Sequence, residues 1–487
     1  MNARTPALPH AFGSLPYAHF APQRNWMNDP NGLVHHDGRY HLFFQYNPDG
    51  VDHAKMSWGH ASSTDLVQWE EHPVALLWQD GAQIFSGSAV VDHANTSGFG
   101  TAENPALAAI YTSAAPGLQN QALAYSVDGG TTWTTYGGNP VLDRGSADFR
   151  DPKVFRYRGA AGEYWVMVAV EAVERRVVIY RSDNLKLWTH LSDYGPRGAV
   201  EGVWECPDLF PLAVDGDPSD VRWVMLISLN EGAPGGGSGT QYVVGSFDGV
   251  TFTPDDDGED AAVLWLDYGR DDYAGVTFSG LPEQERTLIA WMSNWDYAKD
   301  LPYREDEPRR GAMTLARRLS LTMVESRPRL RQQPVGPAVH NVAEASGIRV
   351  GDWTALPVAL PPCARIDLAI DLADATGVEL RLGHDEERSG GIRLAYDPRS
   401  GVLTHDRTHV AECFPEAFRT VQALPTRCGS RLELTAWIDV CSLEVFADDG
   451  VSVLTDLTDV ATGGGVSVRS VGGPVLIERI VVASPQD

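Results

Sequence analysis

The stretch Ser126–Trp133 reads Ser-Val-Asp-Gly-Gly-Thr-Thr-Trp, and this Ser-x-Asp-x-Gly-x-Thr-Trp pattern predicts a tight turn between two strands. Weaker copies of the pattern begin at Thr64, Ser182 and Phe247. The aromatic residues that close the copies lie roughly 60 residues apart, and short alternating runs of strand-like composition fill the intervals. A unit of about four strands that recurs in this way predicts the blade of a β-propeller.

Polar residues in short motifs repeat with the same period. Asp29, Ser86, Asp151, Glu205 and Asp272 follow one another in steps of roughly 60 residues. Five equivalent positions predict five blades, and the innermost strand of each blade lines the central channel. If each of these residues lies on that strand, all five converge on one axial pocket. We therefore expect residues 1–325 to form a five-bladed β-propeller that carries the catalytic site.

The sequence pattern of the chain changes after residue 325. A group of prolines leads us to expect a linker at residues 326–350. Residues 351–487 contain a series of alternating runs such as Arg365–Leu372 and Leu432–Ile438. A period of two with polar outer faces predicts an antiparallel β-sandwich, whose expected role is to pack on the propeller. The predicted fold class is therefore all-β.

Composition limits the classes of partner. The chain has 487 residues, 43% hydrophobic and 21% charged, which predicts two or three folded domains rather than a disordered chain. The formal net charge of −27 disfavours nucleic acids and anionic membrane surfaces as partners. No run approaches the roughly 20 apolar residues that span a bilayer. Residues 1–17 lack the apolar run of a signal peptide, so we expect that the protein stays inside the cell or that a leader has been removed.

We expect no cofactor and no metal site. The five cysteines are odd in number, widely spread and without a CxxC pair, which argues against a disulfide framework or a structural zinc site. The acidic stretch 255–260 does not have the spacing of an EF-hand, and we expect a solvated loop there. The oligomeric state stays open.

Three carboxylates in proline-flanked motifs, Asp29, Asp151 and Glu205, carry the expected chemistry. Glycoside cleavage needs one carboxylate that attacks or stabilises the anomeric carbon, and a second that gives a proton to the leaving oxygen. We expect Glu205 to be the acid, because its neighbours Trp204 and Cys206 solvate it poorly and desolvation raises the pKa of a carboxyl. A single Asp-Pro unit usually only makes a turn, but three carboxylates in phase on one channel favour catalysis.

The residues around these carboxylates suggest how they are held. Asp29 lies between Asn28 and Asn31, whose amides would keep it ionised as a nucleophile. Arg150 would keep Asp151 charged and orient it toward sugar hydroxyls. Of the 14 tryptophans, Trp69, Trp133 and Trp188 close the turn repeats and are assigned to packing, whereas Trp26, Trp58 and Trp295 are the pocket candidates.

These motifs resemble those of glycoside hydrolase family 32, the invertase, inulinase and levanase family. The matching motifs are Trp26–Gly32, Phe43–Pro48, Ser57–His60, Phe85–Ser88, Arg150–Pro152, Glu205–Pro207 and Trp291–Trp295. The resemblance covers almost the whole chain and implies a five-bladed propeller, a C-terminal sandwich and a retaining mechanism. It makes Asp29 the nucleophile toward C2 of a terminal β-fructofuranosyl unit, Asp151 the transition-state stabiliser and Glu205 the acid/base, with nucleophile and acid/base ~5–5.5 Å apart. The substrate-binding candidates are Asn28, Gln45, His53, Trp58, Phe85, Ser86, Arg150, Asp272, Tyr273 and Trp295.

Two positions depart from the exo-acting levanases and exo-inulinases that the chain otherwise resembles. His53 stands where those enzymes usually carry Trp, and Arg309-Arg310-Gly311 stands where they usually read Trp-Arg-Gly. Both changes place a polar or basic group near the pocket instead of an aromatic wall. We expect cleavage of levan- or inulin-type fructans, and of sucrose as a further substrate, while β-2,6 against β-2,1 linkage and exo against endo attack stay open.

Three alternatives remain. A hydroxyl of the next fructosyl unit that captures the covalent intermediate would release a cyclic difructose, as in the levan fructotransferases of the family. A non-catalytic fructan-binding protein should lack one of the three carboxylates, and all three are present. A sialidase is also a propeller with such turns, but it needs an arginine cluster and a Tyr nucleophile, and the net charge of −27 argues against it.

Overall fold

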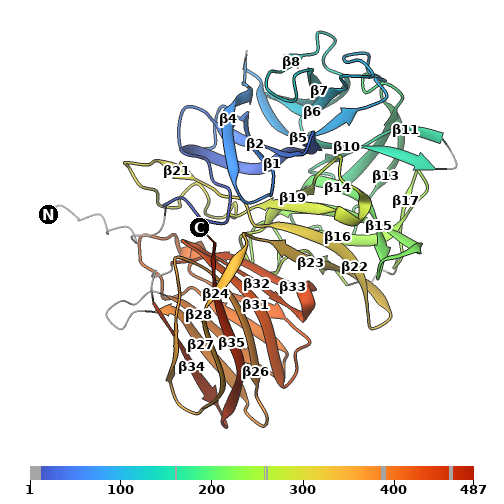
Figure 1. Cartoon of the computed structure of the whole chain (residues 1–487). Helices are drawn as coiled ribbons and strands as arrows, with labels where there is room; N and C mark the ends of the chain where they lie inside the picture. Colours follow the sequence, from blue (N-terminus) through green and yellow to red (C-terminus); the bar gives the residue numbers. More distant parts are fainter. Residues whose placement is uncertain are drawn as a thin grey trace.

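The computed structural model describes residues 13–79, 81–159, 162–256, 258, 262–384, 391–459 and 464–486. Parts of the acidic stretch 255–260 lie outside these ranges, so the expectation of a solvated loop there is not addressed. Within them, helical structure consists of three short 3-10 turns, η1 (Glu283–Glu285), η2 (Glu416–Phe418) and η3 (Asp448–Gly450). No helix in the described part of the chain is long and apolar enough to cross a membrane. Figure 1 shows the two bodies of the molecule, a ring of strands above and a stacked pair of sheets below.

The N-terminal body is a five-bladed β-propeller, as predicted. Blades 1 to 4 each contain four main antiparallel strands in chain order, and two short strands, β9 and β18, pair at their edges. The strands of blades 1 and 2 are β1 (Asn25–His36), β2 (Arg39–Asn47), β3 (Ser57–Ser63), β4 (Trp69–Leu76), β5 (Gln83–Asp92), β6 (Ala106–Ala115), β7 (Leu118–Ser126), β8 (Thr134–Thr135) and β9 (Leu142–Ser146). Those of blades 3 and 4 are β10 (Phe149–Gly159), β11 (Gly162–Glu171), β12 (Arg176–Ser182), β13 (Thr189–Tyr194), β14 (Val203–Val214), β15 (Asp217–Asn230), β16 (Gly239–Phe247), β17 (Phe252–Pro254) and β18 (Leu264–Trp265).

The fifth blade closes the ring. Its strands are β19 (Tyr273–Thr277), β20 (Thr287–Trp291), β22 (Ala316–Val324) and β23 (Arg327–Val335), while β21 (Arg309–Arg310) joins blade 1 beside β1. The first strands β1, β5, β10, β14 and β19 contact one another in a ring around the axis. The last blade is fastened to the first by hydrogen bonds from the His35 amide to the Ser279 carbonyl (2.8 Å) and from the Ser279 amide to the Leu33 carbonyl (2.9 Å). This closed ring is what brings five separate motifs to one axis.

The repeated turn joins the third and fourth strands of blades 1 to 4. In blade 2 the Ser126 hydroxyl donates to the Asp128 carboxylate (2.7 Å) and accepts from the Gly130 amide (2.9 Å), and the Trp133 indole donates to the Gly130 carbonyl (3.1 Å). The indoles of Trp69 and Trp188 make the same bond to the carbonyl three residues earlier, at 3.2 and 3.1 Å. These tryptophans are half-buried against the blade cores, which agrees with a packing role.

The C-terminal body is an antiparallel β-sandwich of two six-stranded sheets, as predicted. One sheet has the order β24-β35-β26-β31-β32-β33 and the other β25-β34-β27-β28-β29-β30. The strands are β24 (Val339–Val350), β25 (Thr354–Ala359), β26 (Cys363–Asp371), β27 (Gly377–His384), β28 (Ile392–Asp397), β29 (Val402–Asp406), β30 (Val421–Pro425), β31 (Arg431–Asp439), β32 (Ser442–Ala447), β33 (Ser452–Leu457), β34 (Gly465–Val471) and β35 (Val475–Pro485). Apolar residues from the inner faces of both sheets form one continuous core.

Residues 326–350, expected to be a linker, are not one. β23 pairs with β22 in the last propeller blade, and β24 pairs with β35 in the sandwich. Only the three residues between Val335 and Val339 connect the two strands. Proline did not prevent strand formation here, because a proline is tolerated where a strand has a free edge.

The two bodies are joined by buried polar contacts. The main chain at 267–272 lies along β33, with hydrogen bonds from the Tyr268 amide to the Val453 carbonyl (2.9 Å) and from the Asp271 amide to the Thr455 carbonyl (3.0 Å). The guanidinium of Arg317 in β22 binds the carboxylate of Glu444 in β32 (2.7 Å). This interface leads directly into β19, the first strand of blade 5.

Candidate active site

All five first strands are irregular at the same level of the channel. In each of them the antiparallel register shifts where one of the repeated polar motifs occurs. The shifts lie between Met27 and Pro30, Ile84 and Gly87, Arg150 and Lys153, Glu205 and Asp208, and Tyr273 and Val276. A β-bulge re-aims side chains and takes backbone amides out of the ladder. At each bulge the polar residue departs from the regular strand geometry, and the five bulges lie at one level of the axis.

Asp29 occupies the bulge of β1. Its Oδ2 accepts a hydrogen bond from the Ser86 hydroxyl (2.7 Å), and its Oδ1 accepts one from the Asn28 amide (2.9 Å). Burial raises the pKa of Asp29, the charge of Glu205 adds to the rise, and the bonds from Ser86 and Asn28 oppose it. Asn31 was expected to hold this carboxylate, but its amide donates to the Pro30 carbonyl instead (2.8 Å).

Asp151 lies in the bulge of β10 with a left-handed backbone (φ 62°). Its Oδ2 accepts the amide of Cys206 (3.0 Å). Burial raises the pKa of Asp151, Arg150 opposes the shift and the charge of Glu205 adds to it, which together bring the pKa to about 7. The buried thiol of Cys206 lies 3.6 Å from Oδ2 of Asp29 and 3.7 Å from Oδ2 of Asp151, so the two aspartates meet across one sulfur atom.

Glu205 approaches the aspartates from β14. Its Oε1 binds the Arg150 guanidinium (3.1 Å), and its Oε2 accepts the hydroxyl of Tyr273. The environment differs from the expected apolar one, because Trp204 packs in the blade core and Cys206 turns toward the aspartates. The Glu205 side chain remains 21% exposed, against 6% for Asp151. Glu205 is thus the carboxylate that is most open to a ligand.

Aromatic rings line one side of this cluster. His53 and Trp295 are half-buried, with ring centroids 5.2 Å apart, and both pack on Trp26, at 5.8 and 6.1 Å. Phe85 lies 6.4 Å from His53. Burial lowers the pKa of His53 to about 4, helped by the positive charge of Lys299, so the ring is neutral above that pH.

Five of the expected substrate ligands are at most 2% exposed and so have almost no surface for a ligand: Asn28, Gln45, Trp58, Asp272 and Tyr273. Trp58 is fully buried and donates its indole N–H to the Phe85 carbonyl (3.0 Å). It therefore stabilises the main chain at the bulge of β5. Gln45 is 2% exposed, and its amide donates to Asn31 Oδ1 (2.6 Å). Tyr273 is fully buried and holds Glu205.

Asp272, another of these five, does not face the axis. Its Oδ2 lies 3.1 Å from Nη1 of Arg317 at the domain interface, where both side chains are completely buried. The expectation that the fifth landmark enters the pocket was therefore wrong. Successive side chains of a strand point to opposite sides, and in blade 5 it is Tyr273 that points to the axis.

Comparison with known proteins agrees with this arrangement. Residues 19–334 match the family model described as the glycosyl hydrolases family 32 N-terminal domain, and residues 339–481 match the family 32 C-terminal model. The chain belongs to glycosyl hydrolase family 32. It is therefore a glycosidase, as the three carboxylates led us to expect.

Individual members of the family are similar over nearly the full chain. A levanase of Bacillus subtilis is 42% identical over 93% of this chain and 69% of its own length. An extracellular exo-inulinase of Aspergillus niger is 39% identical, over 92% of this chain and 90% of its own. The crystal structure of an exo-inulinase from Aspergillus awamori superposes with a TM-score of 0.90 at 36% identity and covers 98% of this chain and 99% of that one.

The two departures, His53 and Arg309, have different surroundings. The Arg310 guanidinium donates to the Val51 carbonyl (3.2 Å) and pairs with the Asp52 carboxylate (3.2 Å), directly before His53. Arg309 is buried and donates to the Gly13 carbonyl (2.9 Å). Arg310, which the usual Trp-Arg-Gly motif also contains, thus stabilises the loop that carries His53. Arg309, which replaces the Trp, contacts Gly13 and Glu307 instead.

Sequence reasoning missed two buried polar residues beside the site. Thr112 and Gln121 form a cross-strand pair of β6 and β7, and both bond the main chain near Asp151. They belong to no motif. The available signal was two fully buried polar residues opposite each other in neighbouring central strands.

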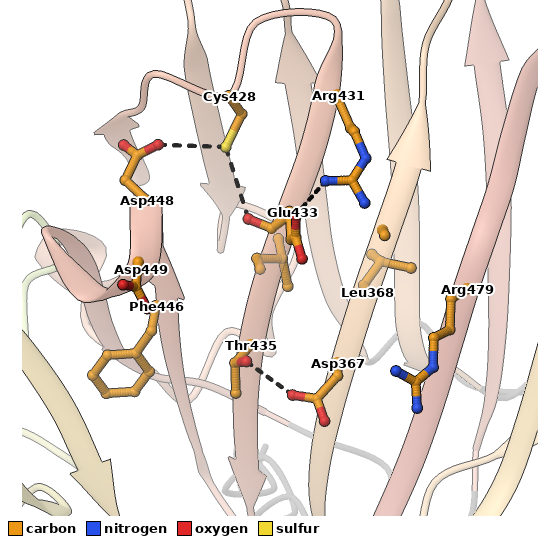
Figure 2. Close-up of a pocket in the computed structure, with 12 residues that line it drawn as sticks. Asp367, Leu368, Cys428, Arg431, Glu433, Thr435, Phe446, Asp448, Asp449 and Arg479 are labelled. Atoms are coloured by element: carbon orange, nitrogen blue, oxygen red, sulfur yellow. Dashed lines mark hydrogen bonds and ion pairs between the residues drawn. The ribbon is translucent and has the colours of Figure 1, made fainter.

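The sandwich carries a second hollow, which is unrelated to this cluster. A groove of about 580 Å³ opens against β26 and β31, and none of the expected site residues lines it. Figure 2 shows its polar side chains bound to one another, such as Thr435 to Asp367 (2.8 Å) and Cys428 to Asp448 (3.6 Å). Within the described ranges, no group of three or more His, Cys, Asp or Glu side chains is arranged to hold a metal ion.

Proposed function

We propose that this chain removes terminal β-D-fructofuranosyl units from levan- or inulin-type fructans, and from sucrose, through a covalent fructosyl-enzyme intermediate. The observation that carries the proposal is the meeting of three carboxylates on the propeller axis: Asp29 and Asp151 flank the Cys206 sulfur, and the Arg150 guanidinium pairs with both Asp151 and Glu205. The levanase and exo-inulinase relatives support a fructan as the substrate.

In the first step Asp29 attacks C2 of the fructosyl unit while Glu205 protonates the departing oxygen. Ser86 and Asn28 hold both oxygens of Asp29 and so fix its direction of attack. Asp151 and Arg150 remain to bind the ring hydroxyls as positive charge develops on the sugar. In the second step Glu205 takes a proton from water, which attacks C2 and releases fructose from Asp29.

The carboxylates of the cluster interact through their charges. Arg150 pairs with Asp151 and Glu205, and the charge of Glu205 acts on both aspartates, so the three carboxylates cannot all ionise without mutual repulsion. Burial and that repulsion raise the pKa values of both aspartates, which keeps a proton on the cluster at a pH where separate carboxylates would have lost it. A retaining glycosidase needs one ionised and one protonated carboxyl at the same time.

The histidine at position 53 favours a second outcome for the same intermediate. A histidine in place of an aromatic wall gives the acceptor side of the pocket a polar edge, next to the ion pair of Arg310 and Asp52. A fructosyl hydroxyl held there would attack C2 instead of water and would release a cyclic difructose.

Product analysis tests both outcomes. We expect free fructose as the first product from levan, inulin and sucrose, with the fastest polymer identifying the preferred linkage. A difructose lighter than the linear disaccharide by one water would show that intramolecular transfer takes the place of hydrolysis. Intact substrates in all three reactions would contradict the proposal.

The roles of the two reacting carboxylates are separable with an activated substrate. Glu205→Gln should lose turnover of sucrose but keep fructosylation by p-nitrophenyl β-D-fructofuranoside, whose leaving group needs no proton. Asp29→Asn should lose turnover of both substrates, by about 10⁴-fold or more, because no covalent bond can form. Retained activity in Asp29→Asn would contradict its assignment as nucleophile.

A further inference from the structure

Thr112 and Gln121 form a buried polar pair in the middle of blade 2. They stand directly opposite each other in β6 and β7, and neither has any exposed surface. Their neighbours in the same strands include the apolar Ile110 and Leu123. Buried polar groups are kept in such surroundings only where they satisfy other polar groups.

The partners of this pair are main-chain atoms of the catalytic motifs. The Thr112 hydroxyl accepts the amide N–H of Asp151 (2.9 Å), and its own hydrogen points to the Ser86 carbonyl or to Oε1 of Gln121, both at 3.2 Å. The amide of Gln121 donates to the Phe149 carbonyl (2.9 Å). One threonine of blade 2 therefore bonds the backbone of two bulges, one in its own blade and one in blade 3.

The bulge of β10 needs such a partner. Because the register shifts between Arg150 and Lys153, the amide of Asp151 has no acceptor in β11. Asp151 also has a left-handed backbone conformation (φ 62°), which is unfavourable for residues other than glycine. A buried amide without an acceptor is costly, so the Thr112 oxygen stabilises the conformation that aims the Asp151 carboxylate at the axis.

We propose that Thr112 is a positioning residue of the active site, which fixes the separation of Ser86 and Asp151 and, through Ser86, the direction of Asp29. The Ser86 hydroxyl binds Asp29, while Asp151 binds the amide of Cys206, so one hydroxyl lies behind the contacts of both aspartates. Thr112 touches no substrate. This inference rests on the proposed function, since it gives Asp29 and Asp151 the roles described above.

The test compares three variants on sucrose and on p-nitrophenyl β-D-fructofuranoside. Thr112→Val has nearly the same shape and removes the hydroxyl, Thr112→Ser keeps it, and Thr240→Val is the matched control. Thr240 is also a buried threonine of a central propeller strand, and its hydroxyl bonds Ser228 (2.9 Å) across β15 and β16.

For Thr112→Val we expect kcat to fall about 10- to 100-fold with KM changed less than about twofold, because a displaced Asp151 affects the transition state more than the bound substrate. Thr112→Ser should restore most of kcat. Thr240→Val should lower the melting temperature to a similar degree and leave kcat within about twofold of the wild type.

Equal kcat values for Thr112→Val and Thr240→Val would overturn the inference, and so would a failure of Thr112→Ser to recover activity. If Thr112→Val does not fold, Gln121→Met, which removes the bond to Phe149, should show the same selective loss of kcat; an unchanged kcat there would also overturn it. The proposed function fails separately, if the wild type cleaves no fructoside or if Asp29→Asn remains active.

Discussion

The side chains of Asp272 and Tyr273 leave the chain on opposite sides at the start of β19. The Tyr273 hydroxyl donates to Oε2 of Glu205 on the propeller axis, whereas Oδ2 of Asp272 lies 3.1 Å from Nη1 of Arg317. The same guanidinium binds Glu444 of the sandwich at 2.7 Å. Two consecutive residues thus connect the domain interface to Glu205, the proposed acid/base, and the sandwich lies behind the site without entering it.

The first prediction concerns the protonation of Asp272. Burial and the charges of Asp267 and Glu444 together raise its pKa to about 8, although Arg317 opposes the rise. The folded protein therefore keeps a proton that the unfolded chain releases near pH 4, so this group makes stability fall as pH rises from about 4 to about 8. Asp272→Asn mimics the neutral form and should flatten that part of the curve of melting temperature against pH. Parallel curves for wild type and variant would contradict it.

The interface also shows why Asp272 could not be placed from the sequence. The period of the five polar motifs correctly predicted five blades and the convergence of Asp29, Ser86, Asp151 and Glu205. Period alone does not say which of two adjacent residues turns inward once a bulge interrupts the strand. That choice at Asp272 depends on Arg317 and on the sandwich, which are distant in the sequence.

The second prediction concerns the N-terminal segment that bridges the two bodies. His19 lies between Asp439 (2.9 Å) and Glu444 (2.8 Å), and all three side chains are buried. Although burial disfavours the charged ring, the bonds to both carboxylates raise its pKa to about 9. Its contribution is fully present below about pH 6.5 and is lost as pH rises through about 9.

His19→Gln should therefore be less stable than the wild type near pH 6, by about 3 kcal/mol, because two buried carboxylates lose a cation. The difference should shrink above about pH 9. Chemical denaturation at both pH values measures it. A difference in the free energy of unfolding that does not change with pH would show that His19 is neutral in the folded protein.

The third prediction concerns His53 in the pocket wall. Its ring is neutral above about pH 4 because burial lowers its pKa, and it packs on Trp26 and Trp295. Below that pH the ring gains a charge beside the catalytic carboxylates. His53→Gln cannot gain this charge, so kcat/KM of the wild type should fall more steeply than that of the variant below about pH 4.5. Profiles of kcat/KM from about pH 3.5 to about pH 7 that superimpose after scaling would contradict this.

The supporting residues around the site were less predictable than the carboxylates. The carboxylates lie in motifs with proline and asparagine, which mark irregular strand ends in the sequence. Thr112 and Trp58 act from neighbouring strands through bonds to main-chain carbonyls and amides, and such bonds impose no pattern on the sequence around them. A tryptophan beside a catalytic motif looks the same whether it stacks on a sugar or supports the backbone.

The fourth prediction distinguishes those two roles for Trp58. Its indole is fully buried against Phe43 and donates to the Phe85 carbonyl (3.0 Å), next to the serine that binds Asp29. Trp58→Phe should lower the free energy of unfolding by about 1–2 kcal/mol and kcat by about tenfold, with little change in KM, because Ser86 loses its backbone support. Trp295→Phe is the matched comparison, since Trp295 is half-buried in the pocket wall, and there KM should rise with little loss of stability. A rise in KM without loss of stability in Trp58→Phe would instead make Trp58 a substrate contact, which would require the pocket to open beneath Phe85 when sugar binds.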